Sequence, residues 1–124
     1  MKIAVVTDDH QTISAHFGRA AYYEIFTIEN GKVSGRQALS KSNHQHVSPD
    51  EPHQEGHQHN HDHNTMLEPI LDCQVLITRG MGMGAYNALK IRSIESLITD
   101  IREIESAVNA YLAGMLIDHP ERLH

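Results

Sequence analysis

A polar tract rich in histidine interrupts the sequence and limits where a hydrophobic core can form. Seven of the 11 histidines fall between His44 and His63, with four acidic residues and two prolines among them. Almost nothing in this tract is apolar except Val47, so it cannot bury enough surface to offset the entropy lost on ordering. We therefore expect residues 40–64 to be a mobile loop inserted into a single domain that spans residues 1–124.

Length and charge exclude several classes of protein. A chain of 124 residues is long enough for one domain and too short for two. The net charge of -6 gives no long-range attraction for DNA or RNA, so we expect no nucleic-acid partner. No stretch approaches the ~18 consecutive apolar residues of a membrane span, so we expect no membrane association. The single cysteine, Cys73, excludes an intrachain disulfide and is typical of a reducing cytoplasm.

Short apolar and β-branched runs predict five strands. Residues 2–7, 75–78 and 94–98 have the pattern of buried strands. Residues 22–29 and 32–39 flank Asn30-Gly31, which is the strongest short signal for a hairpin because both turn residues need positive φ.

Helices are predicted between and after these strands. Residues 65–68 have the form of a capping box and predict a short helix to about residue 71, and a helix is predicted to start over residues 85–90. The last helix has an apolar stripe and an expected N-cap at Asp100, while Gly114 lies too early in this stripe to be a clean stop. The stripe consists of Ile104, Ala107, Val108, Tyr111, Leu112 and Met115. The order of elements predicts an α/β domain with a mixed five-stranded sheet and helices on its faces.

The first candidate site follows the first strand. In residues 13–20, Gly18 permits a sharp backbone path, His16 offers a neutral imidazole to a metal, and Arg19 offers a fixed positive charge. These groups suit an anionic metal cluster or an oxyanion. The alternative is an ordinary surface histidine and arginine beside a turn.

The second candidate site is the glycine-rich turn over residues 80–84. Backbone amides at such a helix start can bind anions. With Ala85 and Asp100 the turn also satisfies the form of a dinucleotide fingerprint, but only 39 residues follow Ala85 and a dinucleotide fold usually opens with this motif. Met81 and Met83 are interpreted as an apolar wall, with thioether ligands as the alternative.

Both candidate sites would meet at a crevice if the strands before them are parallel neighbours. In open α/β sheets, ligands bind outside the carboxyl ends of such strands. Asp8, Asp9 and His10 would flank the same crevice. A carboxylate pair is also found in two-metal nucleases, but the sequence offers no convincing third carboxylate.

The histidine tract is a third candidate site. His57, His59, His61 and His63 repeat at every second residue, so an extended segment would project all four to one side. Such a tract predicts binding of a divalent metal, Ni, Zn or Cu. The alternative is a solvated linker. Cys73 is interpreted as a packing residue, since a lone cysteine cannot hold an iron–sulfur cluster.

Several segments together resemble one family in their order along the chain. They are Met1-Lys2-Ile3-Ala4-Val5-Val6, Ile13-Ser14-Ala15-His16-Phe17-Gly18-Arg19-Ala20, Asn30-Gly31, Gly80-Met81-Gly82-Met83-Gly84-Ala85-Tyr86, and residues 104–116. The sequence resembles the dinitrogenase iron–molybdenum cofactor biosynthesis family, the small nitrogenase accessory proteins. The likeness covers nearly the whole chain outside residues 40–64.

This resemblance implies a ribonuclease H-like fold with sheet order 3-2-1-4-5 and an antiparallel second strand. It implies a carrier of a metal–sulfur cofactor, of the iron–molybdenum type or related, and not an enzyme. The contacts that it implies are His16, Arg19, Gly80, Gly82 and Gly84. It implies cofactor donor and acceptor proteins as partners and leaves a homodimer open.

The sequence departs from the family pattern in two places. A glycine usually ends the helix that starts near Ala85, and residues 90–93 stand there instead. The histidine tract is also long.

The first function hypothesis, from the resemblance, is a non-enzymatic cofactor carrier in the cytoplasm. The alternatives are a metal-ion buffer or chaperone that acts through the tract and, less favoured, a nuclease or nucleotide enzyme.

Overall fold

The computed structural model describes residues 1–41 and 66–124 and contains five strands and two helices in those ranges. The strands are β1 (Lys2–Thr7), β2 (Tyr22–Glu29), β3 (Lys32–Ser40), β4 (Val75–Thr78) and β5 (Glu95–Ile98). The helices are α2 (Met83–Ile91) and α3 (Ile104–Leu112), and short 3-10 turns are η1 (Phe17–Arg19), η3 (Glu68–Ile70) and η4 (Pro120–Arg122).

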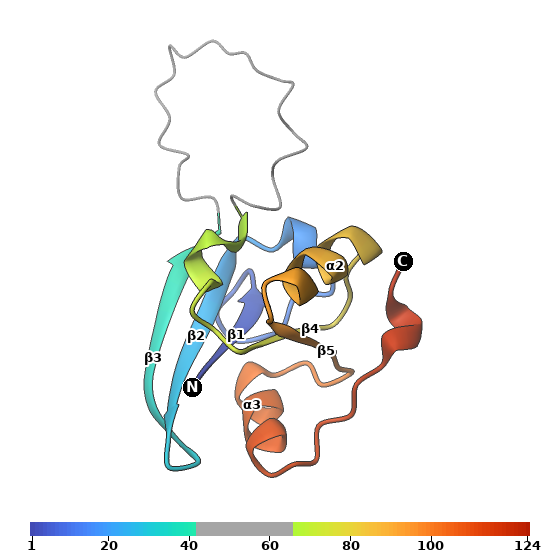
Figure 1. Ribbon diagram of the computed structural model, residues 1–124. Coiled ribbons are helices and arrows are strands. Elements are labelled where there is room, and N and C mark those ends of the chain that lie inside the picture. Colours follow the sequence, from blue (N-terminus) through green and yellow to red (C-terminus); the bar gives the residue numbers. More distant parts are fainter. Residues whose placement is uncertain (42–65) are drawn as a thin grey trace, which may run out of the picture.

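The five strands form one mixed sheet in the order β3-β2-β1-β4-β5 (Figure 1). β2 is antiparallel to both β1 and β3, whereas β1, β4 and β5 are parallel to one another. The predicted mixed sheet, its strand order and the antiparallel second strand are therefore confirmed.

The β2–β3 hairpin turns at the predicted Asn-Gly pair. Asn30 has a φ of 56° and Gly31 a φ of 76°, as a two-residue turn between twisted strands requires. The prediction of this turn from two residues is confirmed because local backbone preference decides it.

Adjacent residues of β2 show which elements cover each face of the sheet. The Tyr23 hydroxyl donates to Met66 O at 2.9 Å, which places Tyr23 on the face covered by η3. The Glu24 carboxylate accepts from Arg36 Nε at 2.9 Å, and Arg36 also pairs with Glu105 of α3. Because successive side chains of a strand point to opposite faces, η3 and α3 cover opposite faces. Figure 1 shows α2 and α3 on opposite sides of the sheet.

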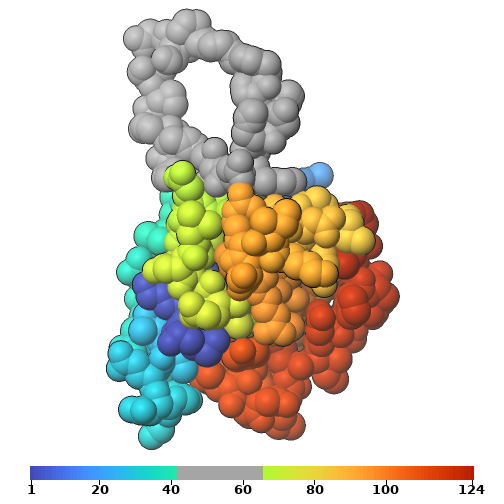
Figure 2. Space-filling view, in the orientation of Figure 1, coloured from blue at the N-terminus to red at the C-terminus, as the bar shows by residue number. Residues whose placement is uncertain are grey.

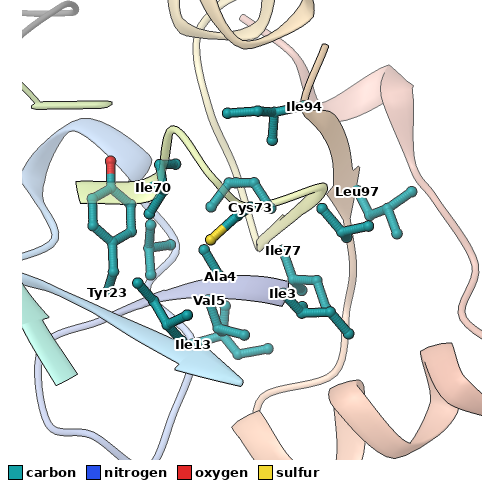
Figure 3. Packing of buried hydrophobic residues seen from close by; sticks show 14 of the residues in the cluster. Ile3, Ala4, Val5, Ile13, Tyr23, Ile70, Cys73, Ile77, Ile94 and Leu97 are labelled. Carbon is teal, nitrogen blue, oxygen red and sulfur yellow. The ribbon is translucent and has the colours of Figure 1, made fainter. Parts of the chain in front are cut away.

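The buried apolar residues form one cluster around β1. Ile3, Ala4, Val5 and Val6 are all fully buried, as expected of a strand with helices on both sides. Figure 3 shows Cys73 inside this cluster, near Ile70 and Ala4 among the labelled residues. Within the described residues, no helix is long and apolar enough to cross a membrane.

The last helix differs from its prediction at both ends. Its N-cap is Glu103 and not Asp100, because Asp100 pairs instead with Arg122 and His119. The helix ends at Leu112, and Gly114, with a φ of 76°, takes the left-handed position just after it. The expectation that Gly114 lies too early to stop the helix was therefore wrong.

The helix after the glycine-rich turn begins two residues earlier than predicted, at Met83, and ends at Ile91. Ser93 takes the position that a glycine usually fills, with a φ of 62°. Ser93 N donates to Lys90 O and Ile94 N donates to Leu89 O, both at 3.0 Å. These bonds form the usual left-handed helix end, so a serine performs the role expected of glycine at some conformational cost.

We therefore expect Ser93→Gly to raise the free energy of unfolding by about 0.5–1 kcal/mol, because glycine relieves the left-handed strain but adds entropy to the unfolded chain. Urea denaturation measures the change. Gly114→Ala is the matched control at the equivalent position of α3 and should lower stability by about 1 kcal/mol. Equal effects of the two changes, in sign and size, would contradict this account.

The boundary of the histidine tract also differs from its prediction. Ser40 belongs to β3, and Lys41 is buried, so the folded part extends beyond the expected start at residue 40. Downstream, Glu68–Ile70 is a 3-10 turn with Pro69 in its first turn, and Thr65 of the expected capping box lies outside the described residues.

Candidate functional site

The two loops singled out from the sequence follow neighbouring parallel strands. β1 pairs with β4 in the parallel sense, with Ile3 opposite Val75 and Val5 opposite Ile77. The first loop, residues 8–21, leaves the carboxyl end of β1, and the glycine turn, residues 79–82, leaves that of β4. The topological condition for the predicted site is therefore met. We call these two segments the loop pair.

Backbone hydrogen bonds join the loop pair directly. Phe17 N donates to Gly80 O at 3.0 Å, and Arg79 N donates to Ser14 O at 3.2 Å. A shift of one loop would break bonds to the other, so the loop pair is one structural unit.

Gly80 makes this close approach possible. A Cβ atom at Gly80 would lie 2.5 Å from Ala15 O, a distance that real Cβ atoms do not show. Its own polar atoms have partners: Thr78 Oγ1 donates to Gly80 O at 2.9 Å and accepts from Gly80 N at 3.3 Å. Gly80 thus shapes the loop pair, and a direct contact of Gly80 with a cofactor stays a prediction.

His16 is the N-cap of η1 and Arg19 is its last residue; both lie in the first loop and both are exposed. His16 O accepts from Arg19 N at 3.0 Å and from Ala20 N at 3.1 Å, which closes the turn. Ser14 Oγ accepts from His16 N at 3.1 Å. No hydrogen bond or ion pair joins the His16 imidazole or the Arg19 guanidinium to another described residue. Both side chains are therefore exposed and unpaired within the described part of the chain, and their binding of a ligand stays a prediction.

The far side of the glycine turn is covered by the C-terminal segment, residues 117–124. Met83 N donates to His124 O at 2.9 Å, and His124 N donates to Met81 O at 3.2 Å. Figure 2 shows the red C-terminal residues packed beside the orange and yellow residues around α2. One amide at the start of α2 is therefore already bonded, which limits the anion-binding role expected of Gly82 and Gly84.

Met81 of the glycine turn and Met83, the first residue of α2, differ in exposure. Met81 is 1% exposed and belongs to the core, whereas Met83 is 50% exposed. The interpretation as an apolar wall therefore fits Met81, and Met83 presents its thioether to solvent.

Two cationic side chains, one in the loop pair and one that contacts it, were missed by the sequence analysis. Arg79 follows β4 directly, and its Nε atom is buried without a hydrogen-bond partner among the described residues. Lys41 is 3% exposed, and its ammonium group donates to Phe17 O in the first loop. A charged residue just after a buried strand was a usable signal for Arg79. No sequence pattern marks Lys41, because its burial depends on the fold around it.

The acidic residues that flank the first strand serve the loop itself. Asp9 Oδ1 accepts from Thr12 N at 2.7 Å and from Gln11 N at 2.9 Å. These backbone bonds, first that from Thr12, lower the pKa of Asp9 to about 2. Asp8 Oδ1 accepts from Ala21 N at 2.8 Å. Both carboxylates therefore brace the first loop, which does not favour the two-metal nuclease alternative.

His10 lies on the α3 side of the sheet. Its Nδ1 atom is 2.5 Å from Glu24 Oε2, and Glu24 also binds Arg36. His10 and Arg36 therefore share the buried carboxylate of Glu24. Among the described residues, no contact joins the His10 side chain to that of His16.

The described residues contain no group of three or more His, Cys, Asp or Glu side chains arranged to hold a metal ion. Burial, together with the nearby Asp72 charge, raises the pKa of Cys73 to about 11, so its thiol stays protonated near neutral pH. The predicted metal ligands of the tract, His57, His59, His61 and His63, lie outside the residues that the structure describes.

Comparison with known proteins gives one family. The model of the family described as dinitrogenase iron-molybdenum cofactor matches residues 1–114. An uncharacterized protein of Methanocaldococcus jannaschii is 23% identical over 116 residues, which cover 94% of this chain and 89% of that protein. The C-terminal segment lies beyond the family match.

Solved structures share the fold. The apo form of the orange protein from Desulfovibrio gigas is 18% identical, with a TM-score of 0.68 over 95% of this chain and 92% of that chain. A candidate dinitrogenase of Methanocaldococcus jannaschii is 15% identical, with a TM-score of 0.67 over 96% of this chain and 94% of that chain. At these identities the likeness shows the fold alone.

Proposed function

Because the chain belongs to the dinitrogenase iron-molybdenum cofactor family, we propose that it is a non-enzymatic carrier of an anionic metal–sulfur cofactor. It receives this cargo from a donor protein and releases it to an acceptor. The sheet order supports the ribonuclease H-like fold that the sequence resemblance implies. The proposal assigns the cargo to the loop pair.

The unpaired cationic groups of the loop pair carry this proposal. Among the described residues, the Arg19 guanidinium has no partner and the buried Nε of Arg79 has no acceptor. Buried polar groups nearly always have a hydrogen-bond partner, so an orphaned guanidinium nitrogen favours a ligand that brings acceptors. Sulfide and oxide groups on an anionic cluster supply both acceptors and negative charge.

His16 supports a metal-containing anion over a simple one. Its imidazole is exposed and unpaired among the described residues, and a neutral imidazole is a common ligand for borderline-soft metals. We propose that His16 binds a metal atom of the cargo and that Arg19 and Arg79 bind its anionic periphery. A carrier needs only reversible binding, so no residue is assigned a proton transfer or a nucleophilic step.

A metal-ion buffer or chaperone acting through the histidine tract is the alternative. We propose that His57, His59, His61 and His63 bind a divalent ion such as Ni, Zn or Cu, on the evidence of their alternating spacing. This second site is distinct in residues from the loop pair, so substitution separates the two.

A binding experiment with substituted variants of the loop pair tests the proposal. The probe is tetrathiomolybdate, an anionic molybdenum sulfide, titrated without oxygen and measured by visible absorbance and bound molybdenum. We expect His16→Ala/Arg19→Ala to weaken binding about 10- to 100-fold, the loss of one or two charge-assisted contacts. Arg19→Lys should weaken binding less than Arg19→Ala, because it retains the charge and loses only the planar fork.

The control variant replaces His57, His59, His61 and His63 with Asn. It should retain tetrathiomolybdate binding and lose uptake of divalent nickel or zinc. Undiminished tetrathiomolybdate binding by the double variant would remove the loop pair as the cargo site. Bound divalent ion without affinity for the molybdenum sulfide would favour the buffer, and turnover of a nucleic acid or nucleotide would favour an enzyme.

A further inference from the structure

Lys41 is a buried cation beneath the first loop. It follows β3 and extends the hairpin by one rung, since Lys41 N donates to Ala21 O at 3.0 Å. Its ammonium group lies 4.4 Å from the centre of the Phe17 ring and 5.5 Å from that of the Tyr23 ring, and it donates to Phe17 O. Only 3% of the residue is exposed.

Burial of this ammonium group is costly for folding. One carbonyl and two aromatic faces replace only part of the water that a lysine loses on burial. Among the described residues, Asp8 of the first loop is the carboxylate that acts on it, and the phenol of Tyr23 stays neutral because burial raises its pKa. Desolvation outweighs Asp8 and lowers the pKa of Lys41 to about 8. An apolar side chain of similar length would fill the same space at lower cost, so packing does not explain a lysine here.

The position of Lys41 connects it to the cargo residues. Phe17, whose carbonyl it binds, lies between His16 and the rest of η1, and Phe17 N donates to Gly80 O at 3.0 Å. The ammonium group therefore anchors the residue between His16 and Gly18, and the N–H of that same residue binds the glycine turn. It also adds a positive charge under the loop pair.

We infer that Lys41 is a positioning residue of the cargo site, which orients the His16–Arg19 turn and supplies a buried counter-charge that favours an anionic cargo. This inference rests on the proposed function and goes beyond it, because it adds a residue that is almost fully buried. Occupation of the loop pair by an anion stabilises the charged form of Lys41, so binding near pH 8 should take up protons at this amine.

The test uses the full chain with Lys41→Met, and with Lys90→Met as the matched control. Lys90 is exposed at the end of α2, so the same chemical change there removes a charge without disturbing the first loop. Tetrathiomolybdate is titrated by calorimetry in buffers of different ionisation heat between about pH 7 and pH 9.5. We expect Lys41→Met to bind about 10-fold more weakly at pH 7. Lys90→Met should bind like the native chain.

Proton uptake separates the counter-charge from a purely structural role. The native chain should take up as much as about half a proton per bound anion at pH 8 and lose affinity as pH rises through 8, whereas Lys41→Met should show neither effect. Proton uptake that persists in Lys41→Met, or native affinity that is constant from pH 7 to pH 9.5, overturns the inference.

The two proposals fail differently. Native binding that depends on His16 and Arg19 but not on Lys41 overturns only the inference. No binding of the probe by the native chain overturns the proposed function and the inference with it. If Lys41→Met does not fold, the pH profile of the native chain still decides, and Lys41→Arg should retain more affinity than Lys41→Gln because it retains the charge.

Discussion

Replacement of Gly80 with alanine is expected to lower the free energy of unfolding by about 2–3 kcal/mol, the usual cost of overpacking an interior contact. The added Cβ would meet Ala15 O at 2.5 Å, and that atom is backbone, so no side-chain rotation relieves the contact. The loops must separate, which strains the bond from Phe17 N to Gly80 O. Urea denaturation measures the loss, and binding of tetrathiomolybdate should fall at least about 10-fold as His16 and Arg19 move.

Gly82→Ala is the matched control two residues away. A Cβ atom there would lie 3.6 Å from His124 O, an ordinary van der Waals contact, and Gly82 has an extended backbone conformation that alanine adopts freely. We expect its effect on stability to stay within about 0.5 kcal/mol. If Gly80→Ala is as stable as Gly82→Ala, the close approach of Gly80 to Ala15 O does not require a glycine, and this account of the loop pair is wrong.

The parts of the fold that could be predicted are those decided by neighbours in sequence. Continuous apolar, β-branched runs place β1 and β4 at their observed bounds, and Asn30-Gly31 specifies its own turn. The helix ends could not be placed this way. Asp100 has a good N-cap side chain, but tertiary pairing with Arg122 removes it from α3. Ser93 adopts a left-handed conformation that its side chain disfavours, because the Schellman bonds and the burial of Ile94 require it.

The candidate site was predictable to the same extent. His16 and Arg19 could be named as candidates because their residue types, beside a turn after a strand, already indicate chemistry. The role of Gly80 could not, since it depends on Ala15 of another loop. Lys41 was counted with the polar tract because only the folded hairpin shows that it points under the first loop. Nonlocal contacts therefore decide which residues support the site.

The buried charge of Lys41 has opposite effects on folding and on cargo binding. A buried ammonium group lowers the stability of the folded state, and the same charge is what an anionic cargo requires. Such opposition is typical of residues retained for binding and not for folding. It predicts that the variant with the weaker binding is the more stable one at neutral pH.

We expect Lys41→Met to be more stable than the native chain by about 2 kcal/mol at pH 7 and less stable by about 1 kcal/mol at pH 10.5. The pKa of Lys41 is about 8 in the folded chain and 10.5 when unperturbed. Between these two pH values the unfolded chain binds more protons than the folded chain. The free energy of unfolding of the native chain therefore rises with pH, by about 3 kcal/mol over the whole interval. Methionine removes this dependence and also the bond to Phe17 O, which contributes about 1 kcal/mol.

The comparison between variants is needed because other groups act in the same pH range. Burial raises the pKa values of Cys73, to about 11, and of Tyr23, so both contribute stability that is lost as pH rises above the values of their unfolded forms. These contributions are shared by the native chain and Lys41→Met, and they cancel in the difference measured by urea denaturation from pH 7 to pH 10.5. Lys90→Met should show no such trend. A difference between Lys41→Met and the native chain that is the same at every pH would mean that Lys41 is not held as a desolvated ammonium group, and its role as a buried counter-charge would then fail with it.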